Sequence, residues 1–109
     1  MSSISTHVLD TGLGMPAREV PVRLSRVSDD QLVPLQSGTT DDDGRIALLG
    51  TDLEASTYQL WFDIAAYADA SGQDIFFPEV TVTFTVSDER HYHIPLLLSP
   101  FAYSTYRGS

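Results

Sequence analysis

Apolar and polar residues alternate in several short segments of the chain. Every second residue is apolar in segments 20–24, 57–64, 80–86 and 92–98. A period of two is typical of β-strands that bury one face and leave the other in solvent. In segment 80–86 the polar row consists of Thr, a β-branched residue that suits the exposed face of a sheet. The pattern therefore predicts a set of strands that share one core.

Turn and helix signals separate these strands. Asp43-Gly44 predicts a hairpin turn, because both residues tolerate positive φ angles. One short helix is predicted over 65–70, and it ends at Ser71-Gly72. Several short strands within 109 residues predict an all-β sandwich, and we expect a single domain over residues 1–109.

Composition narrows the range of functions. The formal net charge of −9 argues against binding to nucleic acids or to anionic membrane surfaces. The chain has no Cys, which excludes disulfides and thiolate chemistry. Its 6 basic residues are all Arg, so Schiff-base and lysine-base mechanisms are excluded as well. No apolar stretch is long enough to span a bilayer and no secretory signal is visible, so we expect a cytoplasmic protein.

The His residues are the side chains that normally titrate near pH 7, and the chain has 3 of them. The apolar even positions of segment 92–98 should face the core, which places His91 and His93 together on the opposite face. His7 likewise lies off the more apolar row of the first strand. Each of them alone fits an ordinary exposed or hydrogen-bonded His. A zinc site built from His91, His93 and His7 is an alternative, although structural zinc usually has four ligands.

Two further features carry candidate chemistry. Arg45 follows the acidic turn, and because Ile46 and Leu48 should point inward, Arg45 should point outward. Alone it fits a charged residue at a sheet edge. The C-terminal segment 103–109 either completes a sheet or lines a pocket. No G-x-S-x-G or phosphate-binding loop is present, so the sequence supports neither a covalent serine mechanism nor a nucleotide site.

Three separated motifs, in order along the whole chain, resemble the transthyretin-like family. The segment Ser5-Thr6-His7-Val8-Leu9-Asp10-Thr11, followed by Gly14-Met15-Pro16-Ala17, resembles the N-terminal motif of that family. The segment His91-Tyr92-His93-Ile94-Pro95-Leu96-Leu97-Leu98-Ser99-Pro100 resembles the C-terminal motif. The ending Tyr106-Arg107-Gly108-Ser109 resembles the tetrapeptide that marks the enzyme branch of the family. Ala102 departs from the family pattern, which usually has Gly or Ser there.

The resemblance implies a fold, an assembly and an activity. The fold is a two-sheet antiparallel sandwich with one short helix, and the assembly is a homotetramer, a dimer of dimers with ligand sites between the dimers. The enzyme branch hydrolyses 5-hydroxyisourate, a small molecule of urate degradation in purine catabolism, without a cofactor or metal. The implied catalytic residues are His7, Arg45 and His93. The implied substrate-binding residues are His7, Arg45, Tyr106, Arg107, Gly108 and Ser109.

The chemistry of these side chains is compatible with that activity. Hydrolysis of a ring amide needs a base to activate water and a cation near the developing oxyanion. Our hypothesis is that one of His7 and His93 takes the proton from water and the other orients the water or the ring, while Arg45 holds the ring's oxygens. His91 is interpreted as supporting or structural. A non-enzymatic small-ligand carrier on the same fold and a zinc-dependent hydrolase are the alternatives.

Overall fold

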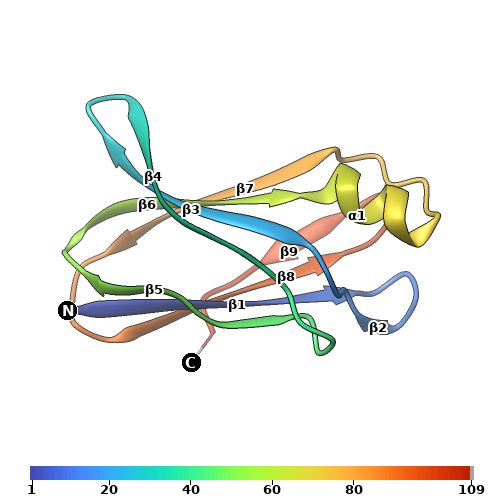
Figure 1. Ribbon diagram of the computed structural model, residues 1–109, viewed down its shortest axis with the longest axis horizontal. Coiled ribbons are helices and arrows are strands. Elements are labelled where there is room, and N and C mark those ends of the chain that lie inside the picture. Colours follow the sequence, from blue (N-terminus) through green and yellow to red (C-terminus); the bar gives the residue numbers. More distant parts are fainter. Residues whose placement is uncertain (109) are drawn as a thin grey trace.

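Two β-sheets face each other in the computed structural model, which describes residues 1–108 (Figure 1). One sheet contains β1 (Ser2–Asp10), β2 (Met15–Pro16), β5 (Arg45–Leu53), β8 (His91–Leu98) and β9 (Tyr103–Thr105). The other contains β3 (Pro21–Ser28), β4 (Gln31–Thr39), β6 (Ser56–Asp63) and β7 (Glu79–Val86). The helix α1 (Ile64–Ser71) lies at one end of the sandwich. The predicted class, a two-sheet sandwich with one short helix, is confirmed.

The core lies between the sheets and is built from the apolar rows seen in the sequence. Leu60 and Phe62 of β6 and Leu96 and Leu98 of β8 have no exposed surface. Burying a side chain of this size stabilises the fold by roughly 1.5–3 kcal/mol. Because side chains alternate along a strand, His91 and the half-buried His93 lie on the face of β8 opposite Leu96 and Leu98. They face outward, as predicted.

The helix matches its prediction to within one residue at each end. The carboxylate of Asp63 accepts a hydrogen bond from the backbone N–H of Ala66 at 3.0 Å, which caps the free N–H groups of the first turn. At the other end Gly72 adopts a left-handed conformation with φ of 67°, and its N–H reaches the last carbonyls.

The central pair of the first sheet, β1 and β8, is parallel, whereas the other strand pairs are antiparallel. This pairing joins the two ends of the chain, which the sequence analysis did not foresee. Its register sets Ser3 opposite His91, Ser5 opposite His93 and His7 opposite Pro95. The motifs at residues 5–11 and 91–100 therefore lie side by side in the fold.

The hairpin predicted at Asp43-Gly44 is wrong, although a turn is present there. β4 pairs with β3 and β5 pairs with β1, so the turn carries the chain from one sheet to the other. The hairpin between β3 and β4 turns instead at Asp29 and Asp30, both with positive φ angles of 49° and 63°. Asp tolerates that conformation because its short polar side chain can bond locally.

The inward orientation predicted for Leu48 is also wrong. Leu48 is 55% exposed, whereas its neighbour Leu49 is fully buried. The β1–β5 ladder changes register between Ile4 and Thr6, where extra residues of β5 face a short piece of β1. Such an irregularity moves the following side chains to the other face. Ile46 lies before it and packs against the core as predicted.

Strand β4 was not predicted from the sequence because it has no buried row. All its residues except Gly38 are exposed, including the apolar Leu32, Val33 and Leu35. The outer part of the β3–β4 hairpin projects beyond the sandwich in Figure 1, so alternation gives no signal there.

Candidate active site

The outer face of the first sheet gathers the polar side chains of β1 and β8. Ile4, Thr6 and Val8 of β1 are buried toward the core, so the odd-numbered residues of this strand face outward. Paired residues of neighbouring strands point to the same face, which adds His91 and His93 from β8. The outward set is Ser3, Ser5, His7, His91 and His93.

Arg45 joins this face from the other side of β1. It is the first residue of β5 and pairs with His7 across the β1–β5 ladder. An open pocket of about 330 Å³ is lined by Arg45, His91 and His93, together with Ser5, Thr6, Ile46 and Ala47. The structure thus brings Arg45 and His93 into one pocket, and His7 lies next to Arg45 in the sheet.

The turn over residues 41–44 holds both His7 and Arg45. The Nε2 atom of His7 lies 2.9 Å from the carbonyl oxygen of Asp43. The carboxylate of Asp41 accepts hydrogen bonds from the backbone N–H groups of Asp43 and Arg45, each at 2.9 Å. A carbonyl only accepts, so Nε2 of His7 carries the proton and Nδ1 of the neutral ring has a free lone pair.

Gly44 is required at the end of this turn. Its φ angle is 75°, and an added Cβ would collide with the backbone oxygen of Val8. Its own carbonyl accepts a hydrogen bond from the N–H of Val8 at 2.7 Å. The turn is therefore pressed against β1 beside His7.

The hydroxyl group of Ser5 bridges the two His residues of β8. Its Oγ lies 2.7 Å from Nε2 of His91 and 2.7 Å from Nδ1 of His93. The outer nitrogen of His91, Nδ1, lies 2.5 Å from Oγ of Ser3. Neither serine was predicted as a site residue from the sequence. The sequence pattern that could have revealed them is the row of odd-numbered residues in the first strand, which also contains His7.

The environment of His93 favours its neutral form. Burial lowers the pKa of His93 below its ordinary 6.5, and the positive charge of Arg45 lowers it further, as do His7 and His91 in their protonated forms. A hydrogen bond to the backbone carbonyl of Ser5 raises the pKa in part. His93 is consequently an unprotonated imidazole near pH 7, as a general base must be.

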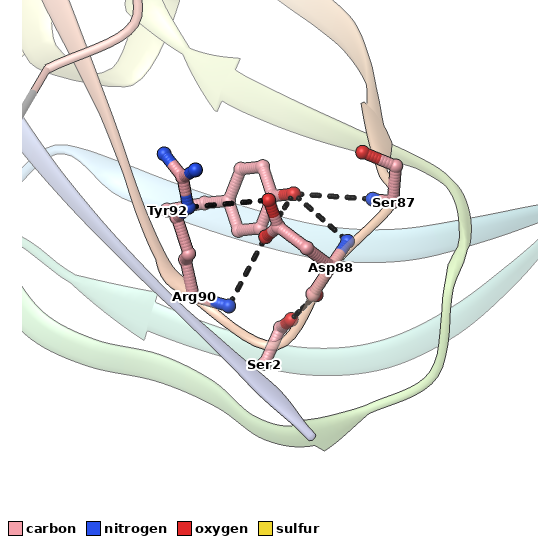
Figure 2. Close-up of polar contacts among 5 residues, drawn as sticks. All are labelled: Ser2, Ser87, Asp88, Arg90 and Tyr92. Carbon is pink, nitrogen blue, oxygen red and sulfur yellow. Dashed lines mark hydrogen bonds and ion pairs between the residues drawn. The ribbon is translucent and has the colours of Figure 1, made fainter.

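The loop before β8 fixes the start of this strand against β1 (Figure 2). The hydroxyl of Tyr92 donates a hydrogen bond of 2.8 Å to the carboxylate of Asp88 and accepts one of 3.1 Å from the N–H of Ser87. The hydroxyl of Ser2 donates to the carbonyl oxygen of Asp88 at 2.5 Å. These contacts hold the register that places Ser5 beside His93.

The C-terminal residues reach the site at one point. The N–H of Gly108 donates to the carbonyl oxygen of His93 at 2.8 Å, and a Cβ added to Gly108 would lie 2.6 Å from the imidazole ring. The guanidinium of Arg107 instead lies 4.6 Å from the centre of the Tyr92 ring. Tyr106 and Arg107 line a second pocket of about 240 Å³. Ser109 lies outside the described residues.

The zinc alternative gains no support from the arrangement of the side chains. Within residues 1–108, no three His, Cys, Asp or Glu side chains are grouped so that they could hold a metal ion.

In the same part of the chain, no helix is long and apolar enough to cross a membrane.

Solved structures share this fold. A structure of Klebsiella pneumoniae 5-hydroxyisourate hydrolase matches with a TM-score of 0.88 and 36% identity, and covers 98% of this chain and 99% of that one. Sea bream transthyretin in complex with thyroxine matches with a TM-score of 0.90 and 34% identity, covering 96% of this chain and 93% of that one. The fold is therefore common to a hydrolase and to transthyretin.

Sequence comparison places the chain in a family. The model of the HIUase/Transthyretin family matches residues 4–108. A protein of Caulobacter vibrioides named 5-hydroxyisourate hydrolase is 44% identical over 115 residues, and the match covers 100% of both chains. The chain belongs to the HIUase/Transthyretin family.

Proposed function

We propose that this protein is an enzyme that hydrolyses 5-hydroxyisourate in the degradation of urate. The observation that carries the proposal is the outer face of the first sheet, where Arg45 and His93 share a pocket and His7 lies beside Arg45. Relatives named 5-hydroxyisourate hydrolase that match over the full length support the same activity.

The proposed reaction is the opening of a ring amide by water. One of His7 and His93 removes a proton from the attacking water while the hydroxide adds to the ring carbonyl carbon. Both rings can serve, because a neutral imidazole has one basic nitrogen. In His7 that nitrogen is Nδ1, since Nε2 faces the carbonyl oxygen of Asp43. The environment of His93 favours its neutral form. The other imidazole orients the water or the ring. The tetrahedral oxyanion then collapses, the ring C–N bond breaks, and the leaving nitrogen takes up the proton.

Arg45 stabilises the negative charge that develops in this reaction. Its guanidinium presents several N–H donors in one plane, which suits the oxygens of a flat heterocycle. Arg45 is exposed and makes no salt bridge with any of the described residues 1–108. Its charge is therefore available to a substrate in the pocket.

The C-terminal tetrapeptide completes the proposed substrate site. Gly108 supports this role, since it lies against the His93 ring. We propose that Tyr106, Arg107 and Ser109 contribute further contacts to the substrate. For Arg107 this means leaving the Tyr92 ring, on which its guanidinium lies in the single chain.

A homotetramer, formed as a dimer of dimers, is the assembly that suits this site. The pocket at Arg45 and His93 is open because it lies on the face of a sheet. A second copy packed on that face would enclose it and exclude water from the substrate. Light scattering at micromolar concentration tests this: we expect the mass of four chains, and a monomer would contradict it.

The cytoplasm is the proposed location. A chain with no Cys has no disulfide that would need an oxidising compartment. Fractionation of cells that express the untagged protein checks the location, with recovery in a membrane or secreted fraction as the contrary result.

Freshly prepared 5-hydroxyisourate tests the function directly. Its decay is followed by absorbance with and without the protein, at a substrate excess of about a hundredfold. An enzyme converts the whole pool faster than the spontaneous rate, whereas a carrier protects at most one equivalent per site. The carrier alternative is worth this comparison because transthyretin itself shares the fold. A chelator arm tests the zinc alternative, and we expect activity to survive it.

A further inference from the structure

The hydroxyl of Ser5 stands between two imidazoles and has no part in the proposed reaction so far. Ser5 is only 7% exposed, so its hydrogen-bond partners are fixed by the fold. Its Oγ has one proton and lies 2.7 Å from both Nε2 of His91 and Nδ1 of His93. With both rings neutral, the direction of that single proton determines which nitrogen of each ring carries a hydrogen.

Two arrangements are compatible with the distances. In the first, Nδ1–H of His93 donates to Ser5, the hydroxyl of Ser5 donates to His91, and His91 donates to Ser3. In the second, each bond is reversed and the proton of His93 lies on Nε2. The first leaves a lone pair on Nε2 of His93, which can accept a proton from water. The second leaves no lone pair there, so His93 could only donate.

The proposed reaction favours the first arrangement. A general base must present a lone pair to the attacking water, and the first arrangement leaves that lone pair on Nε2 of His93. Nδ1 of His93 is turned to the hydroxyl of Ser5, which is only 7% exposed and lies 2.7 Å away. The hydroxyl of Ser5 therefore accepts from Nδ1–H of His93 and donates to Nε2 of His91.

We propose that Ser5 is a positioning residue that holds His93 in the Nδ1–H tautomer, so that Nε2 of His93 is the nitrogen that takes the proton from water. The inference rests on the proposed hydrolase function, because only a reaction makes the free nitrogen useful. Ser5 touches neither the substrate nor the water in this account and acts through His93. When Nε2 is protonated, the resulting imidazolium keeps its Nδ1–H bond to Ser5, which stabilises the positive charge.

The tautomer is measured without any reaction. Ring ¹⁵N shifts of the whole protein labelled at His are recorded near pH 8, and variants of the other His residues give the assignment. We expect His93 in the wild type to show a protonated Nδ1 and an unprotonated Nε2. In Ser5→Ala we expect a mixture of both tautomers, and in Ser5→Thr, which keeps the hydroxyl, the wild-type pattern. A protonated Nε2 in the wild type would overturn the proposal.

Kinetics supply the second readout. Outer partners that fix the tautomer of an imidazole are worth about 10- to 100-fold at metal sites. For Ser5→Ala we expect kcat to fall by about tenfold with KM changed by less than about twofold, and Ser5→Thr to recover most of the loss. Ser25→Ala is the matched control, since Ser25 is a buried serine, 3% exposed, in the other sheet. Equal losses in Ser5→Ala and Ser25→Ala would mean that Ser5 is merely structural.

The two proposals fail in different ways. If His93→Ala keeps full activity, the role of His93 in the proposed function is wrong. If His93→Ala is inactive while Ser5→Ala keeps both the tautomer and kcat, only the role of Ser5 is wrong. Melting temperatures of all variants are compared, and Ser5→Thr provides the folded test case if Ser5→Ala proves unstable.

Discussion

Nε2 of His7 lies 2.9 Å from the backbone carbonyl oxygen of Asp43, within the turn that leads directly into Arg45. One short turn therefore fixes the ring of one candidate catalytic residue and begins the strand that presents another. Because the acceptor belongs to the backbone, a change of the Asp43 side chain leaves it in place. The position of the turn itself, pressed against β1, is what this contact depends on.

Replacing either His of the proposed pair should greatly reduce hydrolysis. General-base help is worth about 10²- to 10⁴-fold, so we expect kcat to fall by that order in His7→Ala and in His93→Ala. The decay of 5-hydroxyisourate at saturating substrate, corrected for the spontaneous rate, measures the effect. His91→Ala is the comparison, with a smaller expected loss. A kcat within threefold of the wild type removes that His from the mechanism.

Activity should depend on the shape of the side chain at position 45 as well as on its charge. Removing a donor to a developing oxyanion costs about 10²- to 10³-fold in kcat, which we expect for Arg45→Ala. Arg45→Lys keeps the positive charge and loses the planar pair of N–H donors, so it should recover only part of the activity. Steady-state kinetics of both variants decide the point. Full activity in Arg45→Lys would show that only the charge matters.

The loss of activity at acid pH should follow the protonation of His93. Burial lowers its pKa, and the charge of Arg45 on β5 lowers it further, as do His7 on β1 and His91 on β8 when they are protonated. The neutral ring is the active form, so activity is lost as pH falls through this pKa, with a midpoint below 6.5.

An NMR titration of His93 checks this value independently of activity. Arg45→Gln removes one of the positive neighbours, so the pKa of His93 should rise in that variant. A wild-type midpoint at or above 6.5 would contradict the account of its environment.

Gly44→Ala should damage both stability and activity. A left-handed conformation costs a non-glycine residue about 1–2 kcal/mol, and the added Cβ would also collide with the Val8 carbonyl oxygen. We expect the free energy of unfolding to fall by more than about 2 kcal/mol. Gly14→Ala is the control, because Gly14 has a φ of 71° but no atom near its added Cβ. Denaturant unfolding compares them, and equal losses would mean that the contact with β1 is unimportant.

The sequence predicted the parts of the fold in which burial alternates. The rows of β6, β7 and β8 and the helix from Ile64 to Ser71 were found, because each has one face in the core. β4 was missed because it has no buried face, and Leu48 was misplaced because a change of register interrupts its strand. Neither effect is visible as a period in the residues.

The candidate site was likewise predicted only in part. Alternation alone placed His7, His91 and His93 on outward faces, and the structure confirms those faces. It could not show that residues 5 and 93 are neighbours, because a parallel pairing of the first and last long strands depends on the whole fold. The contact of Ser5 with both His91 and His93 therefore could not be predicted from the sequence, since it depends on that pairing.

The proposed function requires that His7, Arg45 and His93 together catalyse the hydrolysis of 5-hydroxyisourate. The most direct test compares the decay of the fresh compound with wild-type protein, with the triple variant His7→Ala/Arg45→Ala/His93→Ala, and with buffer alone. We predict rapid decay with the wild type and the buffer rate with a folded triple variant. A wild type no faster than buffer, or a triple variant as fast as the wild type, would contradict it.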